Sequence, residues 1–99
     1  MVVIKLLSII PSTRKDKKLL AIFAVGDKIV KTHFGSKFSE TFIDHNNPLK
    51  KANYIKRHKA LGTENYNDPL TASSLSLYLL WNKPTFEESL EDFKERFNV

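Results

Sequence analysis

The sequence reads LLAIFAVGDKIVKTHF from Leu19 to Phe34, two apolar runs that are separated by Gly26-Asp27. A two-residue turn that begins with glycine, between runs of this kind, predicts an antiparallel hairpin with a type II′ turn. The turn length then fixes the register across the hairpin. In this register Val25 lies opposite Lys28, Phe23 opposite Val30, and Leu20 opposite His33.

The predicted hairpin has one strongly apolar face, because side chains alternate between the two faces of a strand. That face carries Leu19, Ala21, Phe23, Val25, Val30 and Phe34. The other face carries Leu20, Ile22, Ala24 and Ile29, with Lys31 and His33 near its far end. We therefore expect the core to form on the first face.

The flanking sequence extends this hairpin into a sheet. Residues 2–10 are apolar and end at Pro11, which predicts a further strand, and a polar basic loop follows to Lys18. The apolar stretch Thr41–Ile43 predicts a fourth short strand. The N-terminal half should therefore be an antiparallel meander of three to four strands.

The C-terminal half has the signals of three helices. Asn47-Pro48 predicts a helix start, and that helix should run to about Lys59 with Gly62 just past its end. Asp68-Pro69 predicts a second helix to about Trp81, with Asp68 as its N-cap. Thr85 and Glu88 form a capping box for a third. Its apolar stripe consists of Phe86, Leu90, Phe93 and Phe97. Strands followed by helices predict an α+β fold, a single domain over residues 1–99 with the helices on one sheet face.

Composition limits the classes of protein. The chain has 99 residues and no cysteine, so disulfides and thiolate metal sites are excluded. The apolar N-terminus lacks the basic region and cleavage site of a signal peptide, and no run approaches the roughly 20 apolar residues of a membrane span. We expect an intracellular protein that is not secreted and has no membrane partner.

Charge is distributed unevenly along the chain. Residues 1–59 hold 13 Lys or Arg and 4 Asp or Glu, a formal charge of +9. Residues 60–99 hold 3 Lys or Arg and 7 Asp or Glu, a formal charge of −4. This asymmetry favours a polyanionic partner for the basic part, although a well-solvated basic surface would give the same composition.

The predicted helix at residues 48–59 concentrates this charge. At 100° per residue an arc of about 120° contains Lys50, Lys51, Tyr54, Arg57 and His58, while Leu49, Ala52 and Ile55 fall on the opposite side. Guanidinium and ammonium groups bind phosphate, and a tyrosine can stack on a base. The alternative is a surface helix with solvated lysines and a tyrosine at the edge of the core.

A second candidate site is the end of the last predicted strand. His33 is followed by Phe34-Gly35-Ser36-Lys37, which offers backbone amides, a hydroxyl and an ammonium group to an anion. The spacing of a Walker loop is absent, and a turn that requires glycine is the alternative. The loop residues Arg14 and Lys15 would extend the basic surface.

Catalytic chemistry has little support. No nucleophile elbow, zinc-ligand spacing or apolar carboxylate pair is present, so we expect no catalytic residues, no metal site and no cofactor. A His33/His58 acid–base pair beside Arg57 is the one arrangement that could cleave a phosphodiester. We therefore expect a protein that is not an enzyme.

Several strings of the sequence occur together in one family. They are Lys31–Gly35, Tyr54–Lys59, Asn67–Ala72, Leu75–Thr85 and Phe93–Phe97. In this order, from about Ser12 to Phe97, the chain resembles a family of short proteins of unknown function. Giant double-stranded DNA viruses of algae and amoebae encode that family, and phages carry relatives. The resemblance implies a viral origin and a shared fold, with His33, Arg57 and His58 as the matching site residues.

These expectations combine into one leading function and several alternatives. The leading prediction is a non-enzymatic basic viral accessory protein that binds nucleic-acid phosphates, DNA or RNA, in the host cell or the virion. The first alternative is a virion structural protein, such as a minor capsid or tegument-like component. It would dock on an acidic protein surface, with Phe38 and Phe42 as apolar anchors. An inhibitor of a host nucleic-acid enzyme and a homo-oligomer are further alternatives, the latter pairing the acidic last helix with the basic helix.

Overall fold

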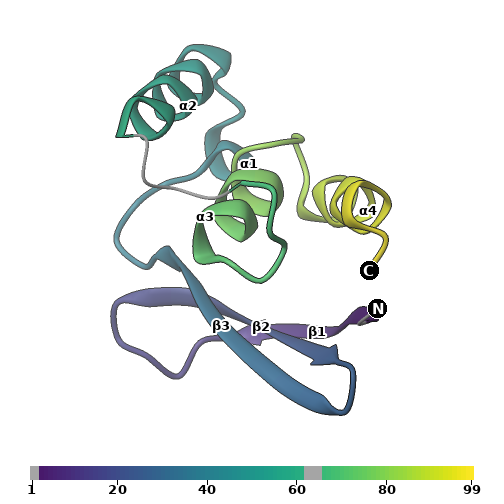
Figure 1. The fold of residues 1–99 in the computed structure, drawn as a ribbon. Helices are drawn as coiled ribbons and strands as arrows, with labels where there is room; N and C mark the ends of the chain where they lie inside the picture. The colour runs from purple at the N-terminus through teal and green to yellow at the C-terminus, as the bar shows by residue number, and fades with distance from the viewer. Residues whose placement is uncertain (1–2, 62–65) are drawn as a thin grey trace.

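The computed structural model describes residues 3–61 and 66–99, and its sheet has the predicted antiparallel order β1-β2-β3 (Figure 1). The strands are β1 (Ile4–Pro11), β2 (Lys17–Val25) and β3 (Lys28–Ser36). Val25 lies opposite Lys28 and Phe23 opposite Val30, so the predicted hairpin register is confirmed. Gly26 has a φ of 62°, whereas Asp27 does not have a positive φ, which agrees with a type II′ turn.

The helical elements lie on one side of this sheet, and α2 lies farthest from it (Figure 1). They are α1 (Phe42–His45), α2 (Pro48–Leu61), α3 (Ala72–Leu75), the π-helical segment η1 (Ser76–Leu80) and α4 (Phe86–Phe97). The predicted α+β class with helices on one face is therefore confirmed. In the part of the chain that the structure describes, no helix combines the length and apolar composition that a membrane crossing requires.

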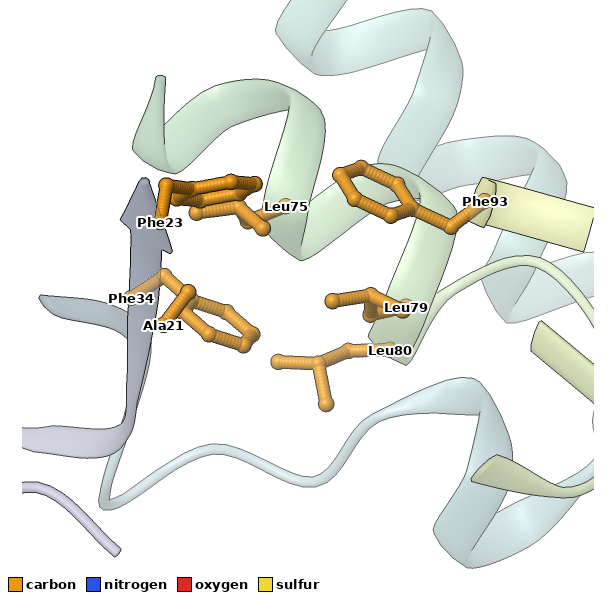
Figure 2. Close-up of a cluster of buried hydrophobic side chains, with 7 residues drawn as sticks. All are labelled: Ala21, Phe23, Phe34, Leu75, Leu79, Leu80 and Phe93. Carbon is orange, nitrogen blue, oxygen red and sulfur yellow. The ribbon is translucent and has the colours of Figure 1, made fainter. Parts of the chain in front are cut away.

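The core lies between the sheet and the segment from α3 to η1. Its fully buried side chains point toward one another from the two layers (Figure 2): Ala21, Phe23, Phe34, Leu75, Leu79, Leu80 and Phe93. The rest of the predicted apolar face of the hairpin and the α4 stripe pack around this cluster. Burying each large apolar side chain stabilises the fold by roughly 1.5–3 kcal/mol, so this cluster holds α3, η1 and α4 against the sheet.

The predicted fourth strand at Thr41–Ile43 is wrong, because these residues begin α1. The Asp44 carboxylate accepts hydrogen bonds from the Thr41 amide at 2.7 Å and from the Thr41 hydroxyl at 3.0 Å. This local capping interaction satisfies a backbone donor that a strand would have paired with a neighbour. The short helix then ends at Asn46, which adopts a left-handed φ of 52°.

The helix predicted from Asp68-Pro69 to Trp81 differs at its start and in its pitch. The Asp68 carboxylate accepts from the Leu70 amide at 2.9 Å and so closes a turn before the helix. Thr71 is the N-cap in its place, since its hydroxyl accepts from the Ser74 amide at 3.2 Å. From Ser76 to Leu80 the helix has π-helical pitch, and Trp81 lies just beyond its end.

The other two helices begin as the sequence predicts. The Asn47 side chain accepts from the amides of Leu49 and Lys50 at 3.0 and 3.3 Å, and α2 follows. Gly62, which the sequence places just past the end of α2, lies outside the described residues. At the start of α4 the Thr85 hydroxyl accepts from the Glu88 amide at 3.2 Å, as predicted.

Candidate functional site

The basic helix α2 packs against the rest of the molecule through its aromatic side. The Tyr54 ring stacks on the Trp81 indole with 4.2 Å between centroids and 5° between planes, and the His58 imidazole lies 4.1 Å from the same tyrosine ring. Leu49, which the helical projection places on the opposite side, is 68% exposed. Two stacked aromatic rings remove more apolar surface from water than Leu49 and Ala52 would, so the packed side differs from the one with more aliphatic residues.

Lys51 belongs to this packed side and makes its contacts within the chain. Its ammonium group donates to the Asn82 carbonyl at 2.6 Å and lies 5.0 Å from the centroid of the Phe42 ring. These contacts join α2 to α1 and to the segment before α4. Lys50 and Arg57, by contrast, are exposed.

A hollow of about 460 Å³, the main hollow, lies where the sheet, α2 and the α3–η1 segment meet. The sheet contributes Lys17, Gly35 and Ser36, and the connector to α1 contributes Ser39, Glu40 and Thr41. Helix α2 contributes Tyr54, Arg57 and His58. The last side is formed by Ala72, Ser73, Ser76, Leu80 and Trp81. A cavity of this volume is large enough for a small ligand or one unit of a polymer.

A smaller hollow of about 280 Å³ adjoins the main one. The two share Glu40, Arg57 and Trp81, and the smaller one adds His45, Lys50 and Asn53. Arg57 therefore lines both hollows. The exposed Lys50 brings a further cation to the same surface.

The chemistry of the main hollow suits an anion. Lys17 and Arg57 supply an ammonium and a guanidinium group, and neither side chain forms an ion pair within the part of the chain that the structure describes. Serine hydroxyls come from Ser36, Ser39, Ser73 and Ser76. Guanidinium and ammonium groups with nearby hydroxyl donors are typical phosphate ligands, whereas Glu40 is the one carboxylate in the lining.

Gly35 allows the sheet to approach η1 closely at this hollow. Its φ is 79°, and a Cβ atom at this position would lie 2.8 Å from Leu80 Cδ1. The predicted requirement for glycine is confirmed by this positive φ, but Gly35 lies within β3 and the turn begins only after Ser36. Ser36 lines the main hollow, whereas Lys37 lies outside the lining.

The other basic residues of the prediction flank the main hollow at the end of the sheet. Lys17 lies opposite Ser36 in the sheet, and the Lys37 amide donates to the Asp16 carbonyl at 3.1 Å, so the loop before β2 and the turn after β3 lie together. Arg14 and Lys15 are exposed in this loop, and Arg14 lies 3.7 Å from the Asp16 carboxylate.

His33 is not part of this arrangement. Its side chain extends from the opposite sheet face, where its Nδ1 is 2.7 Å from the Ser12 hydroxyl, and it lines neither hollow. His58 is half-buried on α2 against Tyr54. The structure therefore does not bring His33 and His58 together as an acid–base pair.

The connector between β3 and α1, which lines the hollow, is held by hydrogen bonds and an ion pair to the Asp44 carboxylate. The bond from the Thr41 amide lowers the pKa of Asp44 below its usual value. The Thr41 hydroxyl and the Lys18 ammonium lower this pKa as well, while partial burial opposes the shift. Lys18 Nζ lies 3.5 Å from Asp44 Oδ2, which ties β2 to α1.

Sequence reasoning missed several residues of the main hollow. Lys17 could have been found, because the hairpin register that pairs Leu20 with His33 also pairs Lys17 with Ser36. Ser73 and Ser76 carry no signal, since small polar residues in a helix are equally typical of close packing. Trp81, which the sequence marks only as the approximate end of a helix, stacks on Tyr54 and lines both hollows.

Comparison with protein families identifies a family that the chain matches. Residues 7–58 match a family model described as "Family of unknown function (DUF5754)". The match begins within β1 and spans the rest of the sheet, α1 and most of α2, so it includes Lys17, Ser36, Arg57 and His58 but ends before the α3–η1 wall of the hollow. No curated protein and no solved structure shows significant similarity to the chain.

Proposed function

Because the chain belongs to DUF5754, a family of unknown function, its own site has to indicate its role, and we propose that it binds nucleic-acid phosphates without catalysing a reaction. The phosphate-binding element is the main hollow, with Lys17 and Arg57 as the principal cations. Further cations surround the hollow and extend the contact along the nucleic-acid strand: Lys50, Lys37, Arg14 and Lys15.

One observation carries this proposal: Lys17 and Arg57 are 40 positions apart in the sequence, yet they line the same hollow. Their side chains come from β2 and α2, and serine hydroxyls from three other segments accompany them. Like charges repel, and neither cation forms an ion pair with the residues that the structure describes, so an anion that binds between them would relieve this repulsion. A phosphate group supplies negative charge for the two cations and hydrogen-bond acceptors for the hydroxyl donors of the lining.

The surrounding charge favours a polymer over a single ion. Residues 1–59 carry a formal charge of +9, and the flanking cations lie outside the hollow, where an isolated phosphate would not reach them. A strand with regularly spaced phosphates can contact the hollow and the flanking cations together. The sequence resemblance supports a viral accessory role for this binding.

The proposal is tested by titrating nucleic acid with the protein at several salt concentrations. If about five phosphates are neutralised, the logarithm of the duplex affinity should fall with a slope of about −4.5 against the logarithm of salt concentration. The variants Lys17→Ala and Arg57→Ala should each weaken binding and make the slope shallower by about one unit.

Lys56→Ala is the matched control, because Lys56 is exposed on the same helix as Arg57 and lines neither hollow. It removes the same charge at a different place on the surface. Equal losses for Lys56→Ala and Arg57→Ala would contradict a defined phosphate site. Affinity weaker than millimolar at low salt would contradict nucleic-acid binding altogether.

A second candidate function is a virion structural protein that docks on an acidic partner. The observation that favours it is Phe38, which is 85% exposed beside the basic surface. The other predicted anchor, Phe42, is buried in the fold and is not available. Mass spectrometry of purified virus particles distinguishes the two functions, since a structural component is present at high copy number.

A further inference from the structure

Phe38 lies at the tip of a turn beside the main hollow. The turn is closed by a hydrogen bond from the Ser39 amide to the Ser36 carbonyl at 3.4 Å, and both of these serines line the hollow. Phe38 therefore lies between two lining residues while its own ring is 85% exposed. An aromatic ring this exposed loses the hydrophobic stabilisation that burial would give it.

The turn is held in place by a contact with the neighbouring loop. The Lys37 amide donates to the Asp16 carbonyl at 3.1 Å, and Asp16 directly precedes Lys17 at the start of β2. The Lys37 side chain is exposed next to Phe38. The exposed ring thus belongs to a turn that is hydrogen-bonded to the neighbouring loop, next to an exposed cation in the sequence and between two residues that line the hollow.

We propose that the Phe38 turn and the main hollow together form a site for single-stranded nucleic acid. An unpaired base stacks on Phe38, and the adjoining phosphate binds between Lys17 and Arg57. This inference rests on the proposed function and adds the class of nucleic acid. In a duplex each base is stacked and paired, so its face is not available to a protein ring, whereas a single strand presents both face and phosphate.

The combination of groups supports this choice over simple surface exposure. Single exposed apolar side chains are common in soluble proteins and by themselves indicate little. Proteins that bind single strands without sequence preference combine a basic groove with exposed aromatic rings. Here the exposed ring of Phe38 lies in the turn between Ser36 and Ser39, and both of these serines line the basic hollow. The serine hydroxyls of the hollow add neutral donors for the sugar–phosphate backbone.

The test compares a 20-nucleotide oligothymidylate with a duplex of equal length by fluorescence anisotropy at one fixed salt concentration. The single strand should bind more tightly. Phe38→Ala should weaken single-strand binding roughly tenfold or more and leave duplex binding unchanged, because only the stacked base is lost. Phe38→Trp should retain the affinity, because the indole also offers a stacking face.

Leu49→Ala is the control, since Leu49 is 68% exposed on α2 and has no aromatic face. It should change neither affinity, and thermal melting should show that neither Phe38→Ala nor Leu49→Ala alters stability. Equal binding of single strand and duplex, with no effect of Phe38→Ala, overturns the inference and leaves the proposed function standing. Loss of particle incorporation by Phe38→Ala, with single-strand affinity intact, overturns it in favour of protein docking. Absence of binding to either nucleic acid overturns both.

Discussion

The ring of Tyr54 lies parallel to the indole of Trp81, with 4.2 Å between the two centroids. The His45 imidazole contacts the same indole edge-on, with 5.5 Å between the ring centroids. Helices α1 and α2 therefore both pack against Trp81. Arg57 follows Tyr54 by three positions on α2. The stack therefore sets where the guanidinium group of the proposed phosphate site lies.

Removing the stack should loosen α2. Tyr54→Ala should lower the free energy of unfolding by about 2–3 kcal/mol, through lost apolar burial and lost ring contact. It should also weaken nucleic-acid binding, because Arg57 is no longer held over the hollow. Urea denaturation measures the first effect. Leu49→Ala, on the exposed side of the same helix, should change stability by less than about 0.5 kcal/mol.

Lys51 and Arg57 should have different roles although both were predicted phosphate ligands. Lys51→Met keeps the apolar stem but removes the bond to the Asn82 carbonyl, so it should lower stability by about 1–2 kcal/mol. Arg57→Ala should leave stability nearly unchanged and weaken nucleic-acid binding. Denaturation and anisotropy on both variants separate the two effects. The reverse pattern would show that the packed side of α2 has been assigned wrongly.

Gly35 should tolerate no side chain. Gly35→Ala places a Cβ atom 2.8 Å from Leu80 Cδ1 and also imposes a left-handed backbone on alanine, so stability should fall by about 2–4 kcal/mol. Gly26→Ala imposes the same kind of backbone in an exposed turn and should cost about 1 kcal/mol. Thermal melting of both variants isolates the steric part. Equal losses would mean that Leu80 moves aside freely.

Asp44 should make stability depend on acidic pH. Its pKa in the folded protein is lowered, first by the bond from the Thr41 amide and then by the Thr41 hydroxyl and Lys18. A lowered pKa stabilises the fold above the unfolded value of 3.8, and this contribution is lost as the pH falls through the folded value. Asp44→Asn should therefore be less stable than the wild type at pH 7.

The difference between wild type and Asp44→Asn should be constant from pH 6 to pH 8 and should shrink as the pH falls below about 4. Denaturant midpoints measured across this range check the prediction. Asp16→Asn is a suitable control, because Asp16 is exposed and its ion pair with Arg14 is long. A difference that grows in acid would contradict the assigned direction of the pKa shift.

The sheet and the core could be predicted from the sequence because local signals and periodicity agree there. The Gly26-Asp27 turn fixes the register, the register fixes which side chains share a face, and the face becomes the core. The stripe on α4 follows the same logic, since its period and its Thr85 cap lie in one short segment. Each of these features depends on residues close together in the chain.

The site could be predicted only in part, because it depends on contacts between distant segments. Helical projection grouped Lys50, Lys51, Tyr54, Arg57 and His58 but could not show which side packs. The stacking partner of Tyr54 is Trp81, 27 positions away in the sequence, and no local sequence pattern indicates that contact. The same holds for the approach of Ser73 and Ser76 to Ser36.

The π-helical pitch of η1 determines how this helix responds to the insertion or deletion of one residue. A π turn accommodates more residues than an α turn, so it absorbs a one-residue insertion without changing the path of the helix. Deleting a single residue between Ser76 and Leu80 would therefore restore regular α pitch and leave the orientation of Trp81 around the axis unchanged. Relatives whose helix is shorter by this one residue would therefore keep the sheet, the core and the same anchor for α2.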